Sequence, residues 1–374
     1  MENNDKHVTK YIVQPGTKIK CFLLGGLLEE NQYEISKQEV ILSTIERIKR
    51  EGTLQNIIEK LKTVSPILVT GSSGYLGSAI VQVLQLHGVR VVGIDLIDSP
   101  TTDFVGCVSD TNFVTKSSAD CKSVIHTAAL HAPNLAFYSD EDYQKVNVKG
   151  TENVLSAAKD FQFKGVVFSS TTSLMNTNLS KQRENESRMG PNIINNATDN
   201  GIPRNIYGLT KKEAEKLCID NKHVNIAILR CSRFFLEDQF DTATNTAKSI
   251  EVSNGNAKAN EIIYGTRASL EDVILSHLIA LDKISGREMC NEVIGPLIIS
   301  SISPLLSSPT DVSFVTNSKL FKTLGWSFPE RVSRIYDSTS SWKALNFTPK
   351  WDFNRLSVEY FNCDCTQMIL DGLY

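Results

Sequence analysis

An α/β fold built on a doubly wound parallel sheet is predicted by three features of the sequence. Short apolar runs that suit buried strands alternate with segments in which apolar residues recur at helical spacing. This alternation occurs five times between residues 67 and 170, and a sixth strand is expected at residues 225–229. A glycine-rich turn also joins the first strand to the first helix. Strands separated by helices pair in parallel, so one sheet with helices on both faces is expected.

The first unit of this fold occupies residues 67–95. An apolar run at residues 67–69 is followed by Gly71, Gly74 and Gly77 at intervals of three residues. Apolar residues then continue at helical spacing, and a second apolar strand at residues 91–94 leads to Asp95. A strand, a glycine-rich turn, a helix and an acid about 20 residues further on are typical of a Rossmann-type dinucleotide site.

The chemistry of the unit indicates which dinucleotide it suits. The glycines permit a tight turn, the approach of a pyrophosphate to the backbone and close packing of helix on strand. Free N–H groups at the helix start attract the phosphates. Asp95 is expected to accept hydrogen bonds from the adenosine ribose and to repel a 2′-phosphate. Residues 96–99 contain no basic side chain to offset that repulsion, so NAD is expected in preference to NADP.

Further cofactor contacts are expected where the third and fourth strands end. The third strand is placed at residues 104–108, after which Asp110 is positioned to bond an adenine amine. The fourth, at residues 123–129, ends in small residues that let a cofactor lie against the backbone. The cofactor-binding residues expected from the turn and the strand ends are Gly71, Ser73, Gly74, Tyr75, Leu76, Gly77, Asp95, Ser109, Asp110, Thr127, Ala128 and Ala129.

Composition excludes several classes of function. The chain has 374 residues and a formal net charge of −3, with no basic run of the kind that binds nucleic acid. Its first residues are too polar for a signal peptide, and no apolar run approaches the length of a membrane span. The eight cysteines are scattered without the spacing of a zinc site, so no metal is expected. These features favour a cytoplasmic enzyme with a small-molecule substrate.

Three regions are expected along the chain. An N-terminal α+β extension at residues 1–64 combines a hairpin, suggested by residues 11–23, with two helical stripes interrupted at Gly52. It is interpreted as an appendage packed on the core or on a partner subunit, and a regulatory or targeting element is the alternative. The nucleotide-binding domain is placed at residues 65–235, and a smaller, substrate-binding lobe at residues 236–374.

The later elements are less regular than the first ones. Residues 178–200 are polar and without period, which predicts a surface loop that serves as a lid or moves freely in solvent. The remaining helices are expected at residues 143–161, 207–221 and 270–284, and a fifth strand at residues 165–170.

Tyr207 and Lys211 form the main candidate for chemistry. They are four residues apart on one predicted helix and therefore share a face. Such a pair means little by itself, but this one opens the helix that follows the fifth strand of a dinucleotide fold. Thr171 lies just past the end of that strand. A phenol, an ammonium and a hydroxyl beside a nicotinamide ring could together move a proton and a hydride.

These motifs, in this order, resemble the extended short-chain dehydrogenase/reductase superfamily, which includes nucleotide-sugar epimerases and dehydratases. The likeness covers about residues 66–355. The segments that carry it are Thr70-Gly71-Ser72-Ser73-Gly74-Tyr75-Leu76-Gly77, Asn147-Val148-Lys149-Gly150-Thr151, Phe168-Ser169-Ser170-Thr171, Tyr207-Gly208-Leu209-Thr210-Lys211, Tyr336-Asp337 and residues 342–352. Residues 229–235 and 258–261 are similar to an epimerase-like branch whose substrates we cannot name.

The resemblance implies roles for four residues. Tyr207 would remove a proton from a substrate hydroxyl while hydride passes to NAD, and Thr171 would hold that hydroxyl. Half-ionisation of a tyrosine at neutral pH needs about 4 kcal/mol of differential stabilisation, which the Lys211 ammonium and the positive nicotinamide ring would supply. Lys211 would also bind the nicotinamide ribose, and with Tyr207 it completes the cofactor-binding set. Asn147 would steady the helix that carries the tyrosine.

Departures from the family pattern separate its reactions. Dehydratases in the superfamily follow the threonine with Asp-Glu, whereas this chain has Thr172 and Ser173, which cannot act as carboxylates. Dehydration is therefore disfavoured. The residues that usually come next are replaced by Leu174-Met175-Asn176, so the shape of this pocket wall is not fixed by the resemblance.

Candidate substrate residues are His131, Arg233, Arg331 and Arg334. His131 falls where epimerases place a substrate-facing group, and a surface histidine is the equal alternative. Arg233 suits a phosphate contact or a pairing with a nearby acid. Arg331 and Arg334 precede Tyr336-Asp337 in a region that often supplies a diphosphate clamp, with a solvated charge pair as the alternative.

The sequence thus predicts an NAD-dependent epimerase that acts on a secondary hydroxyl of a nucleotide sugar. An NAD-dependent alcohol dehydrogenase or ketone reductase of the same superfamily is the nearest alternative. A regulatory protein that senses NAD without catalysis is an alternative of another class. The resemblance further implies a homodimer that packs through the helices at residues 143–161 and 207–221.

Overall fold

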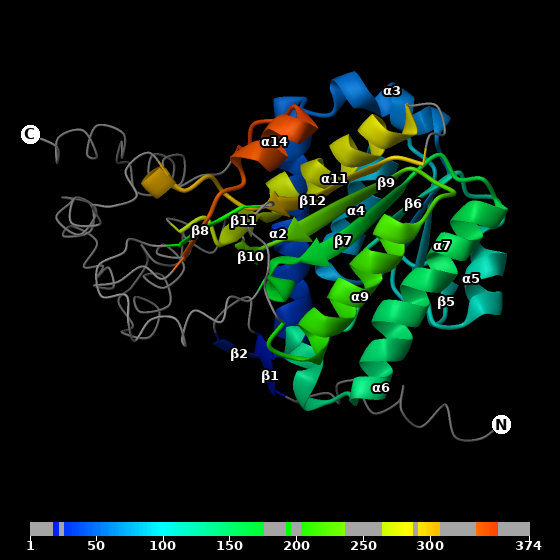
Figure 1. Ribbon diagram of the computed structural model, residues 1–374, viewed down its shortest axis with the longest axis horizontal. Coiled ribbons are helices and arrows are strands. Elements are labelled where there is room, and N and C mark those ends of the chain that lie inside the picture. The colour runs from blue at the N-terminus through cyan, green and yellow to red at the C-terminus, as the bar shows by residue number, and fades with distance from the viewer. Residues whose placement is uncertain are drawn as a thin grey trace, which may run out of the picture.

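A seven-stranded parallel sheet forms the centre of the computed structural model, which describes residues 18–21, 26–175, 192–195, 203–235, 264–286, 291–306 and 334–350 (Figure 1). Its strand order is β12-β9-β7-β6-β3-β4-β5. The bounds are β3 Ile67–Thr70, β4 Val91–Asp95, β5 Phe104–Val105, β6 Ser123–His126, β7 Val166–Thr171, β9 Ile226–Cys231 and β12 Val293–Ile299. The predicted α/β fold with a parallel, doubly wound sheet is therefore confirmed.

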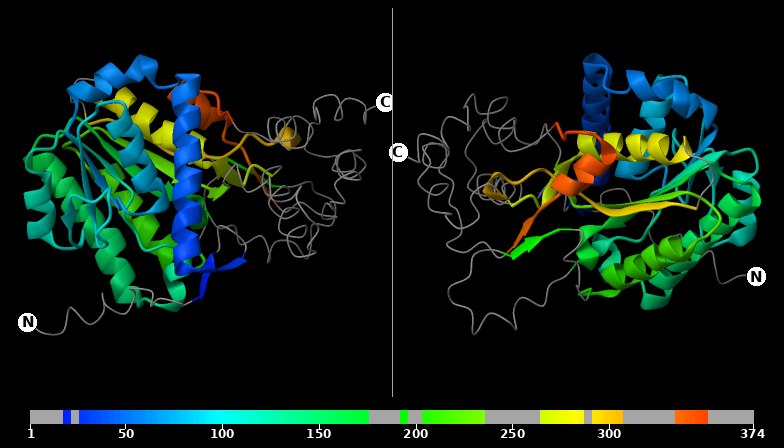
Figure 2. Two further views of the ribbon diagram at one scale, coloured as in Figure 1. Left: turned by 180° about the vertical axis from the view of Figure 1, so that it is seen from behind. Right: turned by 45° about the horizontal axis from the view of Figure 1, so that its top comes forward.

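Two layers of helices cover the sheet (Figures 1 and 2). On one face, α4 Tyr75–Leu86 and α11 Leu270–Ser285 pack in a hydrophobic cluster with Val69 of β3. On the other, α5 Thr111–Ser118, α7 Gly150–Asp160 and α9 Ile206–Asp220 pack against Leu68. Neighbouring residues of one strand thus enter opposite cores, which explains why the strand is apolar throughout rather than alternating.

Two strands are shorter than the sequence suggested, and one was not expected. The third strand was predicted to reach residue 108, but β5 ends at Val105 at the exposed edge of the sheet. The fourth was predicted to reach residue 129, but β6 ends at His126, and the small residues after it lie beyond the strand. Strand β12 extends the sheet to seven strands by pairing with β9.

The N-terminal extension shares the main core. Strands β1 Lys18–Cys21 and β2 Gly26–Glu29 form an antiparallel pair, so the partner of the segment around Ile19 is β2. The other expected hairpin strand, residues 11–13, lies outside the described residues. Helices α2 Glu30–Glu51 and α3 Gln55–Thr63 follow, separated at Gly52, whose φ of +62° suits glycine. Ile48 and Leu61 belong to the same cluster as α4 and α11.

Smaller elements complete the described part of the chain. Two-stranded parallel sheets join β10 Arg233–Phe235 to β11 Arg267–Ser269 and β8 Asn192–Ile194 to β13 Arg334–Tyr336. Helix α14 Thr339–Leu345 packs with α11. Strand β8 falls within residues 178–200, where a loop was predicted, so that prediction is wrong for these three residues. The predicted boundary between two domains at residue 235 stays a prediction. Beyond it, β12 belongs to the central sheet and α11 packs on that sheet.

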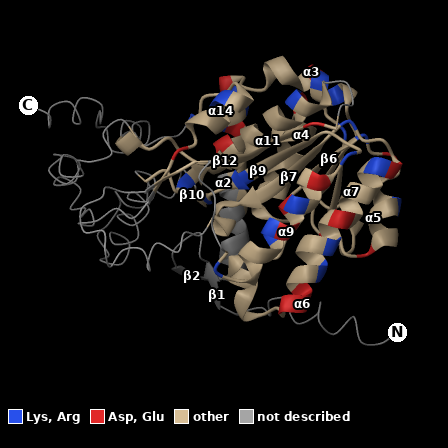
Figure 3. Ribbon diagram, in the orientation of Figure 1, with Lys and Arg blue, Asp and Glu red and all other residues tan. Residues whose placement is uncertain are grey.

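Charged residues are interspersed over the outer helices. Figure 3 shows basic and acidic positions side by side on α7 and α9. Among the described residues, no helix is long and apolar enough to cross a membrane. The same part of the chain contains no group of three or more His, Cys, Asp or Glu residues arranged to hold a metal ion.

Candidate functional site

Gly71 and Gly77 make the turn after β3 possible. Gly71 has a φ of +73°, and a Cβ there would lie 2.8 Å from the amide nitrogen of Ala128. A Cβ at Gly77 would lie 2.0 Å from the carbonyl oxygen of Gly71. Both distances are shorter than real Cβ contacts, so only glycine lets the helix start and the strand end approach this closely. The turn has the compactness that the sequence predicted.

Gly74 is less crowded than Gly71 and Gly77. It is exposed, and a Cβ at this position would meet only the Gly71 carbonyl oxygen, at 3.2 Å. Gly74 is also the N-cap of α4 and has no side chain that could cap the helix. An open backbone at a helix N-terminus is suited to bind a diphosphate. The backbone at the start of α4, which includes Tyr75, Leu76 and Gly77, is thus suited to bind the phosphates of NAD.

Asp95 lies next to this turn, at the end of β4. Its two carboxylate oxygens accept hydrogen bonds from the backbone N–H groups of Ser73, at 3.0 Å, and Ile97, at 3.1 Å. These bonds orient the carboxylate toward the turn. A carboxylate has about four lone-pair sites, so capacity remains for the ribose hydroxyls of NAD. The position fits the predicted role in selecting NAD over NADP.

The other predicted cofactor contacts are spread along the same edge. Asp110 is exposed and caps α5 by accepting a bond from the Phe113 N–H at 3.1 Å. The hydroxyl of Ser109 lies 3.0 Å from the Cys107 sulfur. Thr127 donates to the Thr70 carbonyl oxygen at 2.6 Å, which ties the ends of β3 and β6 together. Thr127, Ala128 and Ala129 are all half-buried beside the glycine turn.

Tyr207, Thr171 and Lys211 meet at the carboxyl ends of β7 and β9. Tyr207 is 6% exposed, and its phenol lies near enough to Thr171 for the side chain of Thr171 to favour the ionised form of the phenol. Lys211 donates from Nζ to the carbonyl oxygen of Ser169 at 2.7 Å. Its Nζ also lies 4.0 Å from the centroid of the Phe168 ring. The three side chains that the sequence singled out therefore belong to one site.

Burial controls the protonation of this site. Desolvation by burial raises the pKa of Tyr207 to about 12, although the neighbouring Thr171 side chain opposes the shift. Burial also lowers the pKa of Lys211 to about 8. Lys211 is not among the groups that shift this pKa, so the lowering by the lysine that the resemblance implied is not seen, and burial dominates. A further positive charge, such as that of an oxidised nicotinamide ring, is needed to favour the phenolate.

Asn147 links two parts of the site. It lies in the π-helical segment η3 Gln144–Lys149, between α6 Asp140–Tyr143 and α7. Its side chain accepts from the Leu130 N–H at 2.8 Å and donates to the Leu130 carbonyl at 3.0 Å. It also donates to the hydroxyl of Thr210 at 3.0 Å, next to Lys211 in α9. These contacts support the predicted role of steadying that helix.

The four predicted substrate residues differ in what the structure says of them. His131 is exposed and lies near the phenol, with its ring centroid 5.8 Å from that of Tyr207 at an interplanar angle of 63°. Arg233 is exposed in β10, directly beyond the end of β9. Arg334 belongs to β13. Arg331 lies outside the described residues.

Two charged residues near the site were not singled out by sequence reasoning. Glu215 is 2% exposed and Arg230 is 6% exposed, and they form an ion pair between α9 and β9. The pattern that could have revealed them is a glutamate four residues after Lys211 and an arginine inside the apolar run of β9. A charged residue in a buried strand needs a partner, which the helix above it supplies.

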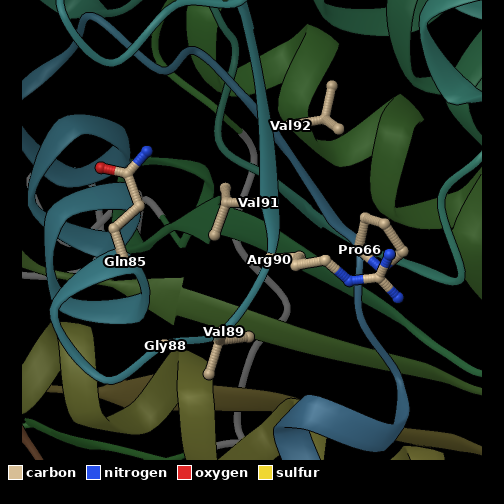
Figure 4. A pocket seen from close by; sticks show the side chains of 7 residues that line it. All are labelled: Pro66, Gln85, Gly88, Val89, Arg90, Val91 and Val92. Atoms are coloured by element: carbon tan, nitrogen blue, oxygen red, sulfur yellow. The ribbon is translucent and has the colours of Figure 1, made fainter.

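A separate pocket lies at the opposite edge of the sheet (Figure 4). It has a volume of about 500 Å³ and surrounds the starts of β3 and β4. Its lining residues are Pro66, Gln85, Gly88, Val89, Arg90, Val91 and Val92. Ligands of doubly wound sheets bind beyond the carboxyl ends of the strands, and this pocket is at the amino ends. We assign no function to it.

Comparison with known proteins agrees with this geometry. Residues 67–278, more than half of the chain, match the model of the NAD dependent epimerase/dehydratase family. A 3 beta-hydroxysteroid dehydrogenase/Delta 5-->4-isomerase of vaccinia virus (strain Copenhagen) is 28% identical over 163 residues, which cover 40% of this chain and 44% of that protein. UDP-glucose 4-epimerase of Halalkalibacterium halodurans is 30% identical over 162 residues, with the same two coverages. The chain thus aligns with less than half the length of these relatives.

Solved structures share the fold. A short-chain dehydrogenase/reductase superfamily protein from Agrobacterium tumefaciens with bound NAD has a TM-score of 0.55 and 19% identity, over 82% of this chain and 99% of that one. MoeE5 in complex with UDP-glucose and NAD has a TM-score of 0.51 and 19% identity, over 80% and 99%.

The family match and the site lead to the same assignment. The expected resemblance is confirmed, as are NAD as the cofactor and an NAD-dependent enzyme of the epimerase and dehydrogenase type. The glycine turn, Asp95 and the Tyr-Lys pair at the strand ends agree with the match to the family model. The chain therefore belongs to the NAD dependent epimerase/dehydratase family.

Proposed function

We propose that this protein is an epimerase that acts on a secondary hydroxyl of a nucleotide sugar. The observation that carries the proposal is the convergence of Tyr207 with Thr171 at the end of β7, where the Lys211 ammonium bonds the carbonyl oxygen of Ser169 in the same strand. This arrangement places a proton acceptor and a hydroxyl-binding group together at the edge where the cofactor-binding turn also opens.

The residues have distinct tasks in the proposed reaction. Bound NAD supplies a hydride acceptor that later returns the hydride. Tyr207 takes the proton of the substrate hydroxyl, and Thr171 holds the oxygen while charge develops on it. Lys211 has two further N–H donors beside the one that bonds Ser169, and these suit the nicotinamide ribose. Asn147 holds α9 against the loop after β6, which keeps both side chains in place.

The substrate class is supported from two sides. UDP-glucose 4-epimerase is among the sequence relatives, and MoeE5 shares the fold as a complex with UDP-glucose and NAD. Thr172 and Ser173 follow Thr171 and provide no carboxylate for the removal of water. Epimerisation therefore fits the site better than dehydration.

A simple dehydrogenase is the second candidate function. Relatives of comparable similarity are named 3 beta-hydroxysteroid dehydrogenases, so oxidation without return of the hydride also has support. Both reactions would use the same Tyr207, Thr171 and Lys211. They differ in whether reduced cofactor leaves the protein in each cycle.

We also propose a homodimer in the cytoplasm. Leu209 and Ile219 of α9 are 44% and 43% exposed, on the helix expected at the dimer interface. Light scattering coupled to size-exclusion chromatography tests the dimer, and cell fractionation tests the location. A monomer at micromolar concentration would contradict the first of these.

The test of the function combines substrates with one variant. Purified protein is mixed with NAD and each of a set of UDP-sugars, and the sugars are analysed by mass spectrometry and chromatography while nicotinamide absorbance is recorded. An epimerase interconverts two sugars without net NADH. Net accumulation of NADH would reject epimerisation in favour of the dehydrogenase.

Tyr207→Phe is expected to lower turnover by a factor of about 100 or more, because the group that moves the proton is lost. Affinity for NADH, measured by fluorescence, should change less than about threefold. Tyr138→Phe is the matched control, since Tyr138 packs on the same cluster as Tyr207. If Tyr207→Phe turns over as fast as the wild type, the assignment of the base is wrong.

A further inference from the structure

A buried ion pair lies directly behind the proposed catalytic lysine. Arg230 donates from Nε and Nη2 to the two carboxylate oxygens of Glu215, at 2.9 Å and 2.7 Å. The hydroxyl of Ser170 donates to the same carboxylate at 2.5 Å. Glu215 is thus held by β7 and β9 at once, in a geometry that leaves its carboxylate little freedom.

The ion pair and Lys211 share the same supports. Glu215 is one turn after Lys211 on α9. Ser170, which bonds Glu215, follows Ser169, whose carbonyl oxygen accepts the Lys211 ammonium at 2.7 Å. The lysine and the glutamate are therefore fixed to two consecutive residues of one strand, and a shift of either group would disturb the other.

The charges of Lys211, Glu215 and Arg230 alternate in sign. Lys211 and Arg230 are cations, and Glu215 is the anion placed with them. Burial disfavours the charged form of Lys211, and the Glu215 carboxylate acts in the opposite direction. Buried ion pairs are weak contributors to stability, because desolvation offsets much of their attraction. The pair therefore adds little net stability, and its position beside Lys211 points to a role in the site besides the mutual neutralisation of two buried charges.

Other groups also face Lys211. Cys218 does so from α9, Cys231 from β9, and His126 and His131 from β6 and the loop after it, while Tyr207 lies one turn before Lys211 on α9. Burial raises the thiol pKa of Cys218 and Cys231 well above neutral, and burial lowers the pKa of His126 to about 3. At neutral pH these thiols and His126 are uncharged. Among the described residues that face Lys211, Glu215 supplies the carboxylate charge.

We propose that Glu215, held by Arg230 and Ser170, is a positioning residue that fixes the Lys211 ammonium and keeps it charged for cofactor binding. The inference rests on the proposed function, in which Lys211 binds the nicotinamide ribose. It makes two predictions of opposite sign. Loss of the Glu215 charge should make Lys211 lose its proton at lower pH, whereas loss of Arg230 should leave Lys211 as the partner of Glu215 and hold the proton to higher pH.

The experiment measures NADH affinity of the full chain by fluorescence between about pH 6 and pH 10. Wild-type affinity is expected to fall as Lys211 deprotonates, near pH 8. The midpoint should move down by roughly half a pH unit or more in Glu215→Gln and up in Arg230→Met. Asp220→Asn, an exposed position on the same helix, is the control and should not move it. A merely structural role would weaken binding equally at all pH values.

Lys211→Met distinguishes a failure of the proposed role of Lys211 from a failure of the proposed role of Glu215. If this variant keeps the alkaline fall in affinity, the proposed role of Lys211 is wrong. If the fall disappears in Lys211→Met but Glu215→Gln and Arg230→Met leave the midpoint unchanged, only the role of Glu215 is overturned. Should Glu215→Gln fail to fold, as judged by circular dichroism, the double variant Glu215→Gln/Arg230→Met removes both buried charges. Its midpoint should still move down, and an unchanged midpoint would overturn the proposal.

Discussion

Burial decides the charge state of individual residues around the site. His126 and His277 are almost fully buried, and burial lowers their pKa values to about 3 and about 4. Both are therefore neutral when folded at pH 7. In the unfolded chain a histidine binds a proton below about pH 6.5. The stability that these residues contribute is thus complete above that pH and is lost as the pH falls toward 4.

His277→Gln tests this dependence on one residue. His277 lies 2.7 Å from both the Ser169 hydroxyl and the Val273 carbonyl, and glutamine can make similar bonds without titrating. The loss of unfolding free energy between pH 7 and pH 5 should shrink by about 2 kcal/mol in this variant. Urea unfolding at the two pH values measures it. His223→Gln, at an exposed position, is the control, and an equal loss in both variants would contradict the prediction.

Asp95→Asn tests the choice of cofactor. The variant loses the charge that attracts ribose hydroxyls and repels a 2′-phosphate. Affinity for NADH should fall about tenfold, which corresponds to about 1.4 kcal/mol, and the preference for NADH over NADPH should narrow. Titration with both cofactors, followed by fluorescence, gives the result. Asp98→Asn on the exposed loop beyond β4 should leave both affinities unchanged. An unaltered preference in Asp95→Asn would mean that another residue reads the ribose.

The place of a functional residue could be predicted where the local sequence pattern determines it. Asp95 follows an apolar strand, and Tyr207 and Lys211 have helical spacing, so their places at the sheet edge could be expected. Glu215 escaped notice because its partner, Arg230, is 15 residues away and is brought to it only by folding. The raised pKa of Tyr207 was missed for a related reason, since desolvation depends on packing from several elements.

At the scale of elements, two glycines of the turn between β3 and α4 allow stability and cofactor binding to be tested separately. Gly77→Ala would place a Cβ 2.0 Å from the Gly71 carbonyl, which is backbone that must shift. We expect a loss of about 1–3 kcal/mol in unfolding free energy. Thermal and urea unfolding measure that loss directly.

Gly74→Ala is the matched variant in the same turn. Gly74 has a φ of −69°, which alanine adopts readily, and its Cβ would meet one atom, the Gly71 carbonyl oxygen at 3.2 Å, which has to move by only a few tenths of an ångström. Stability should change by less than about 0.5 kcal/mol. NADH affinity should nevertheless fall tenfold or more, because the methyl group would occupy the position of the diphosphate. Tight NADH binding by Gly74→Ala would show that the cofactor does not cross this turn.

Element prediction succeeded where the periodicity was strong and failed at the ends. The helix expected at residues 143–161 is present as α6, η3 and α7, but the π-helical segment around Asn147 has no signature in apolar spacing. Strand β5 is short because it lies at the edge with exposed side chains at Phe104 and Val105, where no second neighbour extends the pairing. Edge position is a property of the sheet and cannot be read from the strand itself.

For the whole molecule, the N-terminal helices are part of the main core. Ile48 of α2 is fully buried in the cluster that includes α4 and α11. Arg47 also pairs with Glu271 at the start of α11, at 3.0 Å, with both side chains buried. The interpretation of residues 1–64 as packed on the core agrees with these contacts of the described part.

Ile48→Ala is expected to destabilise the entire protein rather than one end of it. Removal of a fully buried isoleucine costs about 2–5 kcal/mol. The main urea transition, followed by tryptophan fluorescence and circular dichroism, should shift to lower urea concentration. Leu42→Ala, at a 51% exposed position of the same helix, should have little effect. An unshifted main transition in Ile48→Ala would show that α2 unfolds independently.

The covering of α4 and α11 by α2 and α3 has a practical consequence for protein production. The match to the family model begins at residue 67, whereas apolar side chains between residues 41 and 61 cover the outer faces of these two helices. A chain shortened to the region that matches the family model would expose this apolar surface to water. Such chains are expected to associate through it. Aggregation of a trimmed version would then reflect the missing cover and say nothing about the catalytic half of the molecule.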